Sequence, residues 1–449
     1  MTAIAHDSRP QQTHADVTRD VVATLGTQSK GYVLMLLGAV VLFLVGLITF
    51  ILLVKDGLGL AGYKSPVMWS VFITTFVFWI GIGHAGTLIS AILFLFRSPW
   101  RTAVYRATEA MTVFAVMTAG LFPIIHIGRQ WLFYWLLPYP NQRYLWVNFK
   151  SPLMWDVFAV STYLTVSTTF LVVGLVPDVA AVRDKVSGWR KKLYSAFSIG
   201  WTGSDNQWRH YSRGYLYLAA LATPLVLSVH SVVSWDFAMG IVPGWHTTIF
   251  APYFVAGAIY SGIGMVLTLL IPLRKVLHLE HMITEYHFES LAKVALLTGS
   301  ILFYAYGMEY FVAWYSGVNT EQTTFYLRAL GPMWWAGWTM IICNAFVSQL
   351  LWFKKVRTNI AALFVISIFI NIGMWFERYV IIVSSLGNDF IPFAWGQLDP
   401  TWADWGILAG SFGWFLMYFL LFARTFPIVA IQEIKEMIPM PRRRVGGHH

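Results

Sequence analysis

Long apolar segments alternate with short polar segments along most of the chain. Each apolar segment exceeds the roughly 20 residues that an α-helix needs to cross a bilayer, and none alternates with the two-residue period of a barrel strand. Ten such segments occur: 32–54, 67–96, 104–126, 153–177, 215–238, 249–273, 291–315, 331–353, 358–384 and 404–427. Because lipid leaves backbone groups unbonded outside helices and closed barrels, the pattern predicts an all-α membrane protein with about ten transmembrane helices.

The composition agrees with a multi-span membrane protein. Hydrophobic residues make up 57% of the 449 residues and charged residues 12%, against about 25% charged residues in soluble domains. We expect an integral membrane domain over 32–427, flanked by an N-terminal segment (1–31) and a C-terminal tail (428–449). The single cysteine, Cys343, excludes an intramolecular disulfide and a set of cysteine ligands for zinc or an iron–sulfur cluster.

Lysine and arginine residues predict the orientation of the chain. One side of the predicted topology carries 24 of them and the other side six, and the richer side is cytoplasmic by the positive-inside rule. Both termini are therefore expected in the cytoplasm. The net charge of +10 is explained by this topology, so it does not indicate nucleic-acid binding. The polar N-terminus shows no cleaved signal peptide.

A weak repeat relates two parts of the chain. Residues 151–156 and 331–336 both place proline and tryptophan at the start of a segment, 180 residues apart, and Gly-Ile-Gly occurs at 81–83 and again at 262–264. These matches predict two related four-helix units, helices 2–5 (67–238) and 6–9 (249–384), with helices 1 and 10 at the flanks. The second unit has Tyr306 in place of His126 and Ala336 in place of Asp156. The alternative is a chance match of short motifs.

Ionisable side chains inside predicted spans are costly in lipid and are therefore candidate functional residues. They are His84, Glu109, His126, Asp156, His230, Asp236, Glu309, Glu377 and Arg378.

The strongest candidate pair is His126 and Asp156. His126 ends the third predicted helix and Asp156 begins the fourth, and the connection between them is rich in aromatic residues, including Trp131 and Tyr139. An imidazole and a carboxylate at the edge of the hydrocarbon can accept the two protons of a quinol. The pattern favours a quinol site on the outer face. The structural alternative is that Asp156 caps the helix or pairs with Arg129 near the interface, while His126 only anchors the helix end.

The other buried ionisable groups have structural alternatives too. Glu109 either starts a proton path or pairs with Arg106 three residues earlier, and His84 either serves that path or bonds a backbone carbonyl. His230 and Asp236 share the fifth helix and are candidates for relaying protons from the quinol site, or for structural hydrogen bonds.

Two adjacent ionisable groups lie in the ninth helix. Glu377 and Arg378 are expected to point to different faces, so Glu309 is the predicted partner of Arg378 in a buried ion pair that holds the second unit together. Proton transfer is the alternative role for Glu309 and Arg378.

The segments around the candidate site resemble a known family. Leu121 to Arg129 (LFPIIHIGR), 134–141 (YWLLPYPN) and 151–163 (SPLMWDVFAVSTY) are similar to the NrfD/polysulfide-reductase-type membrane subunits. Within this family they are most similar to the ActC subunits of bacterial alternative complex III. The likeness extends over helices 2 to 9 and is most specific at residues 81–163.

The resemblance implies a subunit of the bacterial inner membrane that oxidises menaquinol near the outer face, possesses no haem or metal of its own, and contributes to proton translocation. The implied partners are an extracytoplasmic iron–sulfur subunit, a paralogous ten-helix membrane subunit, cytochrome c subunits carrying haem c, and a terminal oxidase. The implied quinol-site residues are His126 and Asp156, lined by Arg129, Trp131 and Tyr139. The implied proton path includes Asp236, with His230, His84, Glu109, Glu309 and Arg378 carried over less securely.

Three alternatives remain open from the sequence. The chain is a paralogous membrane subunit without a working quinol site, a haem b quinol dehydrogenase subunit with His84, His126 and His230 as axial ligands, or an ion or proton transporter. Axial ligands must lie at matching depth, which His84 and His126 do not, and a transporter does not explain aromatic residues gathered at one boundary.

Overall fold

The chain folds as a long bundle of helices. The computed structural model describes residues 13–26, 29–138 and 149–438, and this part contains helices without strands. Nine helices in it are long and apolar enough to cross a membrane. They are α2 (Lys30–Asp56), α3 (Ser70–Thr87) continued by a π-helical turn (Leu88–Ile92) and α4 (Leu93–Leu95), α5 (Tyr105–His126), α6 (Pro152–Arg183), α8 (Asp205–Ala238), α9 (Phe250–Val276), α10 (Glu285–Ser316), α15 (Ile360–Tyr379) continued by a π-helical turn (Val380–Ser384) and α16 (Ser385–Gly387), and α17 (Trp402–Thr425). The prediction of an all-α, multi-span membrane protein is confirmed.

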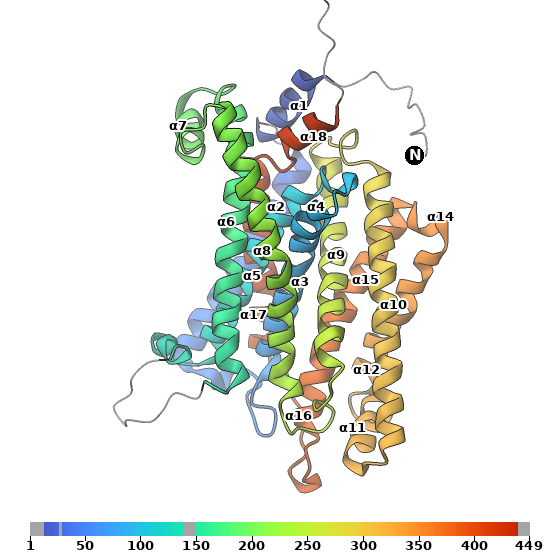
Figure 1. Cartoon of the computed structure of the whole chain (residues 1–449). Coiled ribbons are helices and arrows are strands. Elements are labelled where there is room, and N and C mark those ends of the chain that lie inside the picture. Colours follow the sequence, from blue (N-terminus) through green and yellow to red (C-terminus); the bar gives the residue numbers. More distant parts are fainter. Residues whose placement is uncertain (1–12, 27–28, 139–148, 439–449) are drawn as a thin grey trace, which may run out of the picture.

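Shorter helices lie between and beside these spans. They are α1 (His14–Gly26), α7 (Gly188–Phe197), α11 (Asn319–Leu330), α12 (Trp334–Ile341), α13 (Val347–Gln349), α14 (Lys354–Arg357) and α18 (Ile431–Met437), with 3₁₀ turns at Leu58–Leu60, Pro99–Arg101, Gln130–Leu136, Leu350–Trp352 and Pro392–Ala394. Figure 1 shows α1, α7 and α18 at one end of the bundle and α11 and α16 at the other. We call these the α1 end and the α11 end.

The predicted segment 331–353 differs from the other nine. It is helical but divided into α12, a π-helical turn (Ile342–Phe346), α13 and a 3₁₀ turn. Asn344 lies in the π turn with its amide donating to Tyr306 Oη at 2.9 Å, and Gly373 of α15 lets the two segments approach closely. A π turn opens the helical ladder locally, so this segment is shorter and less regular than its sequence suggests.

The spans pack in two groups of four helices. In the first group α5 and α8 each pack on α3 and α6, and in the second group α9 packs on α10 and α15 while α12 packs on α15. α3 packs on α9 to join the groups, while α2 pairs with α17 at the side of the first group.

Glycines allow the closest helix contacts. A Cβ at Gly410 of α17 would lie 2.3 Å from the Cα of Gly46 in α2, and a Cβ at Gly262 of α9 would lie 2.4 Å from the Cβ of Ala85 in α3. Between helices in lipid, where no hydrophobic effect drives association, such close backbone approach supplies the packing energy. One member of the repeated Gly-Ile-Gly motif, Gly262, therefore lies at the junction of the two groups.

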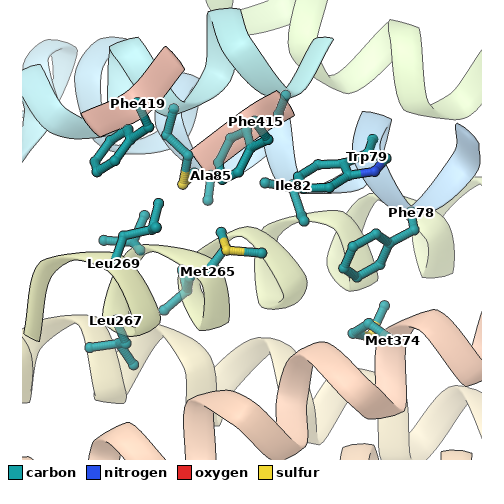
Figure 2. Close-up of a cluster of buried hydrophobic side chains, with 14 of the residues drawn as sticks. Phe78, Trp79, Ile82, Ala85, Met265, Leu267, Leu269, Met374, Phe415 and Phe419 are labelled. Carbon is teal, nitrogen blue, oxygen red and sulfur yellow. The ribbon is translucent and has the colours of Figure 1, made fainter. Parts of the chain in front are cut away.

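The apolar core lies where α3 meets α9 and α17. Figure 2 shows Trp79 of α3 beside Phe415 of α17, with Met265 of α9 facing them. The ring centroids of Trp79 and Phe415 are 4.7 Å apart, and the Trp79 indole N–H donates to Ser411 Oγ at 3.0 Å. This core fixes the spans that carry the polar groups of the candidate site.

Candidate functional site

His126 is the last residue of α5, at the α11 end of the bundle. Pro123 lies in the final turn, and Gly128, with φ +78°, ends the helical path just after it. His126 Nδ1 lies 2.5 Å from Tyr63 Oη, and the two rings are 5.5 Å apart. No described residue bonds Nε2, so one ring nitrogen holds the imidazole in place and the other remains able to bind.

Tyr63 was not among the residues expected from the sequence. It lies in the connection between α2 and α3, and burial raises the pKa of its phenol above the ordinary value, with the Asp404 charge acting in the same direction. Tyr63 therefore keeps its proton at neutral pH. The predicted topology could have identified Tyr63, because it places the connection between the first two spans on the same side of the membrane as His126.

Asp404 fixes the connection that carries Tyr63. Its carboxylate, in the first turn of α17, accepts the backbone N–H of Gly62 at 2.8 Å and the hydroxyl of Ser70 at 2.5 Å. It also accepts the N–H of Thr401 at 2.7 Å in a capping box. A buried carboxylate that accepts several donors is well satisfied, so Asp404 ties α17 to the residues on both sides of Tyr63.

Asp156 and Asp236 form a second polar group at the α11 end. Asp156 lies in the second turn of α6 and is 6% exposed, and its side chain lies close to that of Asp236 near the end of α8. Neither Asp156 Oδ1 nor Asp236 Oδ1 has a hydrogen-bond partner among the described residues. The two residues are therefore neighbouring buried carboxyl groups, each with an oxygen that can still bind.

The aromatic segment after α5 is only partly described. Trp131 is 62% exposed, and Arg129 is exposed as well. The expected lining residue Tyr139 lies outside the described residues. No ion pair joins Arg129 to Asp156 in the described part of the chain.

His126 and Asp156 are not in direct contact among the described interactions. The side chain of His126 contacts Tyr63, whereas that of Asp156 lies beside Asp236. The sequence predicted that His126 and Asp156 face each other, and the structure instead has two separate polar groups at the same end of the first helix group.

His84 and His230 meet deeper in the bundle. Their ring centroids are 4.4 Å apart, and both side chains are at most 1% exposed. His84 Nδ1 lies 2.8 Å from the carbonyl oxygen of Ile80, and neither nitrogen of His230 has a partner among the described residues. Because the two rings touch, no haem macrocycle fits between them as bis-histidine ligation requires.

Glu109 belongs to a buried ionic network toward the α1 end. Arg106 Nη1 donates to Glu109 at 3.0 Å, and Arg106 Nη2 donates to Asp178 of α6 at 3.1 Å. Tyr215 of α8 donates to Glu109 at 3.0 Å. The predicted pairing of Glu109 with Arg106 is confirmed. Asp178, which sequence reasoning did not select, also accepts the N–H of Ile431 at 3.1 Å at the start of α18.

The prediction for Glu377 and Arg378 was wrong. The two side chains form an ion pair with each other, because the long guanidinium side chain bends back along α15 and stacks 4.3 Å from the centre of the Phe254 ring. Tyr306 donates to the other oxygen of Glu377. The rule that adjacent helical residues do not face each other holds for side chains that extend straight from the helix, and arginine need not do so.

Glu309 is not the partner of Arg378 either. Arg328 of α11 is the cation that interacts with it electrostatically, and Glu309 Oε1 has no hydrogen-bond partner among the described residues. The buried ion pair of the second unit therefore forms within α15, between Glu377 and Arg378. Glu309 takes no part in it.

The described residues contain no group of three or more histidine, cysteine, aspartate or glutamate side chains able to hold a metal ion. What the geometry defines is a multi-span membrane protein with paired buried carboxyls, a tethered histidine at one boundary and further ionisable groups in the membrane interior. Groups of this kind mark paths for protons or for redox ligands.

Comparison with known proteins assigns the chain to a family. The family model described as polysulphide reductase, NrfD, matches residues 59–387, and the chain belongs to this family. It is 28% identical over 252 residues to a putative dimethyl sulfoxide reductase membrane subunit of Halobacterium salinarum, covering 56% of this chain and 53% of that protein. It is 19% identical over 423 residues to a selenate reductase subunit of Mesobacillus selenatarsenatis, covering 87% of this chain and 93% of that protein. The chain thus matches about half the length of the first relative and nearly all of the second.

Proposed function

We propose that this chain is the quinol-oxidising membrane subunit of an oxidoreductase complex. The observation that carries the proposal is the state of His126, which is held by Tyr63 through Nδ1 at a membrane boundary while no described residue bonds Nε2. The relatives named as subunits of reductases support this assignment.

The geometry suits removal of two protons from a dihydroxy ring. Nε2 of His126 accepts one hydroxyl proton while Nδ1–H donates to Tyr63 Oη, because a neutral imidazole has one donor and one acceptor nitrogen. Asp156 is buried beside Asp236 with Oδ1 unbonded among the described residues, and its carboxylate accepts the second proton. An iron–sulfur subunit outside the membrane would be the partner that accepts the two electrons.

The quinol is proposed to be menaquinol, and the α11 end to lie at the outer face of a bacterial inner membrane, with both termini in the cytoplasm. The lysine and arginine distribution supports the orientation. His84 and His230, whose ring centroids are 4.4 Å apart, and Glu109 are buried in the same helix group, and we propose that they serve proton movement.

Two assemblies are candidates for the complex. The resemblance of residues 121–163 favours one like alternative complex III, with a paralogous membrane subunit, cytochrome c subunits and a terminal oxidase as partners. The named relatives favour a reductase complex. Haem c absorbance in the complex purified through this chain supports the first assembly, and a copurifying reductase without haem c supports the second.

Asp156→Asn tests the proposed chemistry. The amide keeps the size of the side chain but cannot accept the proton, so we expect quinol oxidation by the purified complex to fall to background while partner subunits remain attached. Asp184→Asn, at the exposed opposite end of the same helix, is the matched control. Wild-type turnover in Asp156→Asn would contradict the role of Asp156.

A further inference from the structure

A large cavity lies at the α11 end of the second helix group. Its volume is about 770 Å³, and it is bounded by the α8–α9 connection, the last turns of α10 and the first turns of α11. Ile241 and Phe390 line it and are 81% and 50% exposed, so they form an apolar rim. The quinol site proposed above involves other residues.

A buried carboxylate faces this cavity. Glu309 lines it and is 9% exposed, and its Oε1 has no hydrogen-bond partner among the described residues. Leaving a buried acceptor unbonded is unfavourable. A ligand that donates a hydrogen bond to Glu309 removes this cost.

The charges around the cavity favour a ligand that donates a hydrogen bond and carries no negative charge. Arg328 interacts electrostatically with Glu309, but its guanidinium bonds Ser385 Oγ at 2.8 Å and stacks on Phe325, so Glu309 Oε1 is left to a ligand. Glu321, also in the wall, accepts the N–H of Gly244 at 3.0 Å. Two carboxylates in the wall disfavour an anionic head group. A hydroxyl that donates to Glu309 meets both conditions.

The position of the cavity parallels that of the His126 site. The connection from 239 to 249 precedes the first helix of the second group, as the Tyr63 connection precedes the first helix of the first group. In each connection a glycine N–H, of Gly62 or Gly244, is bound by a carboxylate from another element. The 180-residue offset of the repeat thus brings both sites to the same membrane boundary.

We propose that the cavity is a second binding site, which takes the hydroxylated ring of a quinol with one hydroxyl donating to Glu309. Phe325 and Phe390 supply aromatic walls, and the apolar rim admits the ligand from the lipid. The second site depends on the proposed function only for the choice of a quinol as ligand. In the repeat, Tyr306 and Ala336 occupy the positions of His126 and Asp156. The second site therefore binds the ring but lacks the two groups proposed to accept protons during oxidation.

Photolabelling tests the second site. The probe is an azido-naphthohydroquinone, added to the purified complex in nanodiscs and mapped by peptide mass spectrometry. We expect labelled residues in 239–249 and 308–325 as well as in 57–69 and 121–136. In Glu309→Gln and Ala313→Trp the label in 239–249 and 308–325 should fall by about tenfold, the loss expected from one hydrogen bond to a charged group or from filling the cavity.

The label in 57–69 and 121–136 reports on folding in each variant. Glu289→Gln, on the same helix but paired at the surface with Lys293 and Arg357, should leave both sets of labels unchanged. Label confined to 57–69 and 121–136 in the wild type would overturn the second site. Label in 239–249 and 308–325 alone would support it while contradicting the proposed function of the His126 site.

Discussion

The hydrogen bond between Tyr63 and His126 gives the sharpest prediction for the proposed site. Tyr63→Phe removes the hydroxyl that lies 2.5 Å from His126 Nδ1 and keeps the ring, which packs 5.6 Å from the centre of Phe72 and 5.5 Å from that of His126. The imidazole keeps its packing but loses the partner that fixes its orientation and tautomer.

The magnitude follows from the value of one hydrogen bond. A net contribution of about 0.5–1.5 kcal/mol, at about 1.4 kcal/mol per factor of ten, predicts a decrease of roughly 2- to 12-fold in kcat/KM for quinol oxidation. The melting temperature of the complex should fall only slightly and its partners should stay attached, because one hydrogen bond is lost while the ring contacts remain.

The assay is quinol:acceptor oxidoreductase activity of the purified complex at several quinol concentrations. Tyr315→Phe is the matched control, since Tyr315 is 76% exposed near the end of α10. If kcat/KM for Tyr63→Phe stays within experimental error of the wild type, the phenol does not position His126 and the reasoning fails.

Two further predictions concern stability. Arg106→Leu leaves Glu109 and Asp178 buried without their cation, and loss of one partner of a buried pair costs about 3–5 kcal/mol of stability. We therefore expect a much lower yield of folded protein in size-exclusion chromatography. A wild-type yield would contradict the ionic network. Gly410→Leu puts a side chain against the backbone of Gly46 and should separate α2 from α17, lowering the melting temperature, whereas Gly38→Leu should be tolerated because nothing lies within 4 Å of a Cβ there. Equal melting of the two glycine variants would show that α2 does not pack as described.

The sequence predicts the architecture because lipid permits few alternatives. Long apolar segments in this composition must be helices, and their connections set which ends share a membrane boundary. The pairing of Glu109 with Arg106 was predictable in the same way, since three residues of helix place the two side chains on one face.

Contacts between distant segments were beyond sequence reasoning. Tyr63 bonds His126, and Asp404 bonds Gly62, although these residues are far apart in the sequence. The contacts form only because α2, α3, α5 and α17 pack together. No local period encodes such contacts, because they depend on how the helices are placed relative to one another.

The error at Arg378 has a different cause. A helical-face rule fixes where Cα–Cβ bonds point, but the flexible arginine side chain follows the Phe254 ring and Glu377 instead. Likewise the division of 331–353 depends on Asn344 finding buried partners, which the apolar pattern of that segment does not reveal.

The most direct test of the central claim compares quinol oxidation by the complex purified through this chain with that of its His126→Ala variant. The account predicts that the wild-type complex oxidises quinol and that the variant, with its partners still attached, does not. Unchanged activity in His126→Ala would contradict the account and place quinol oxidation elsewhere in the complex.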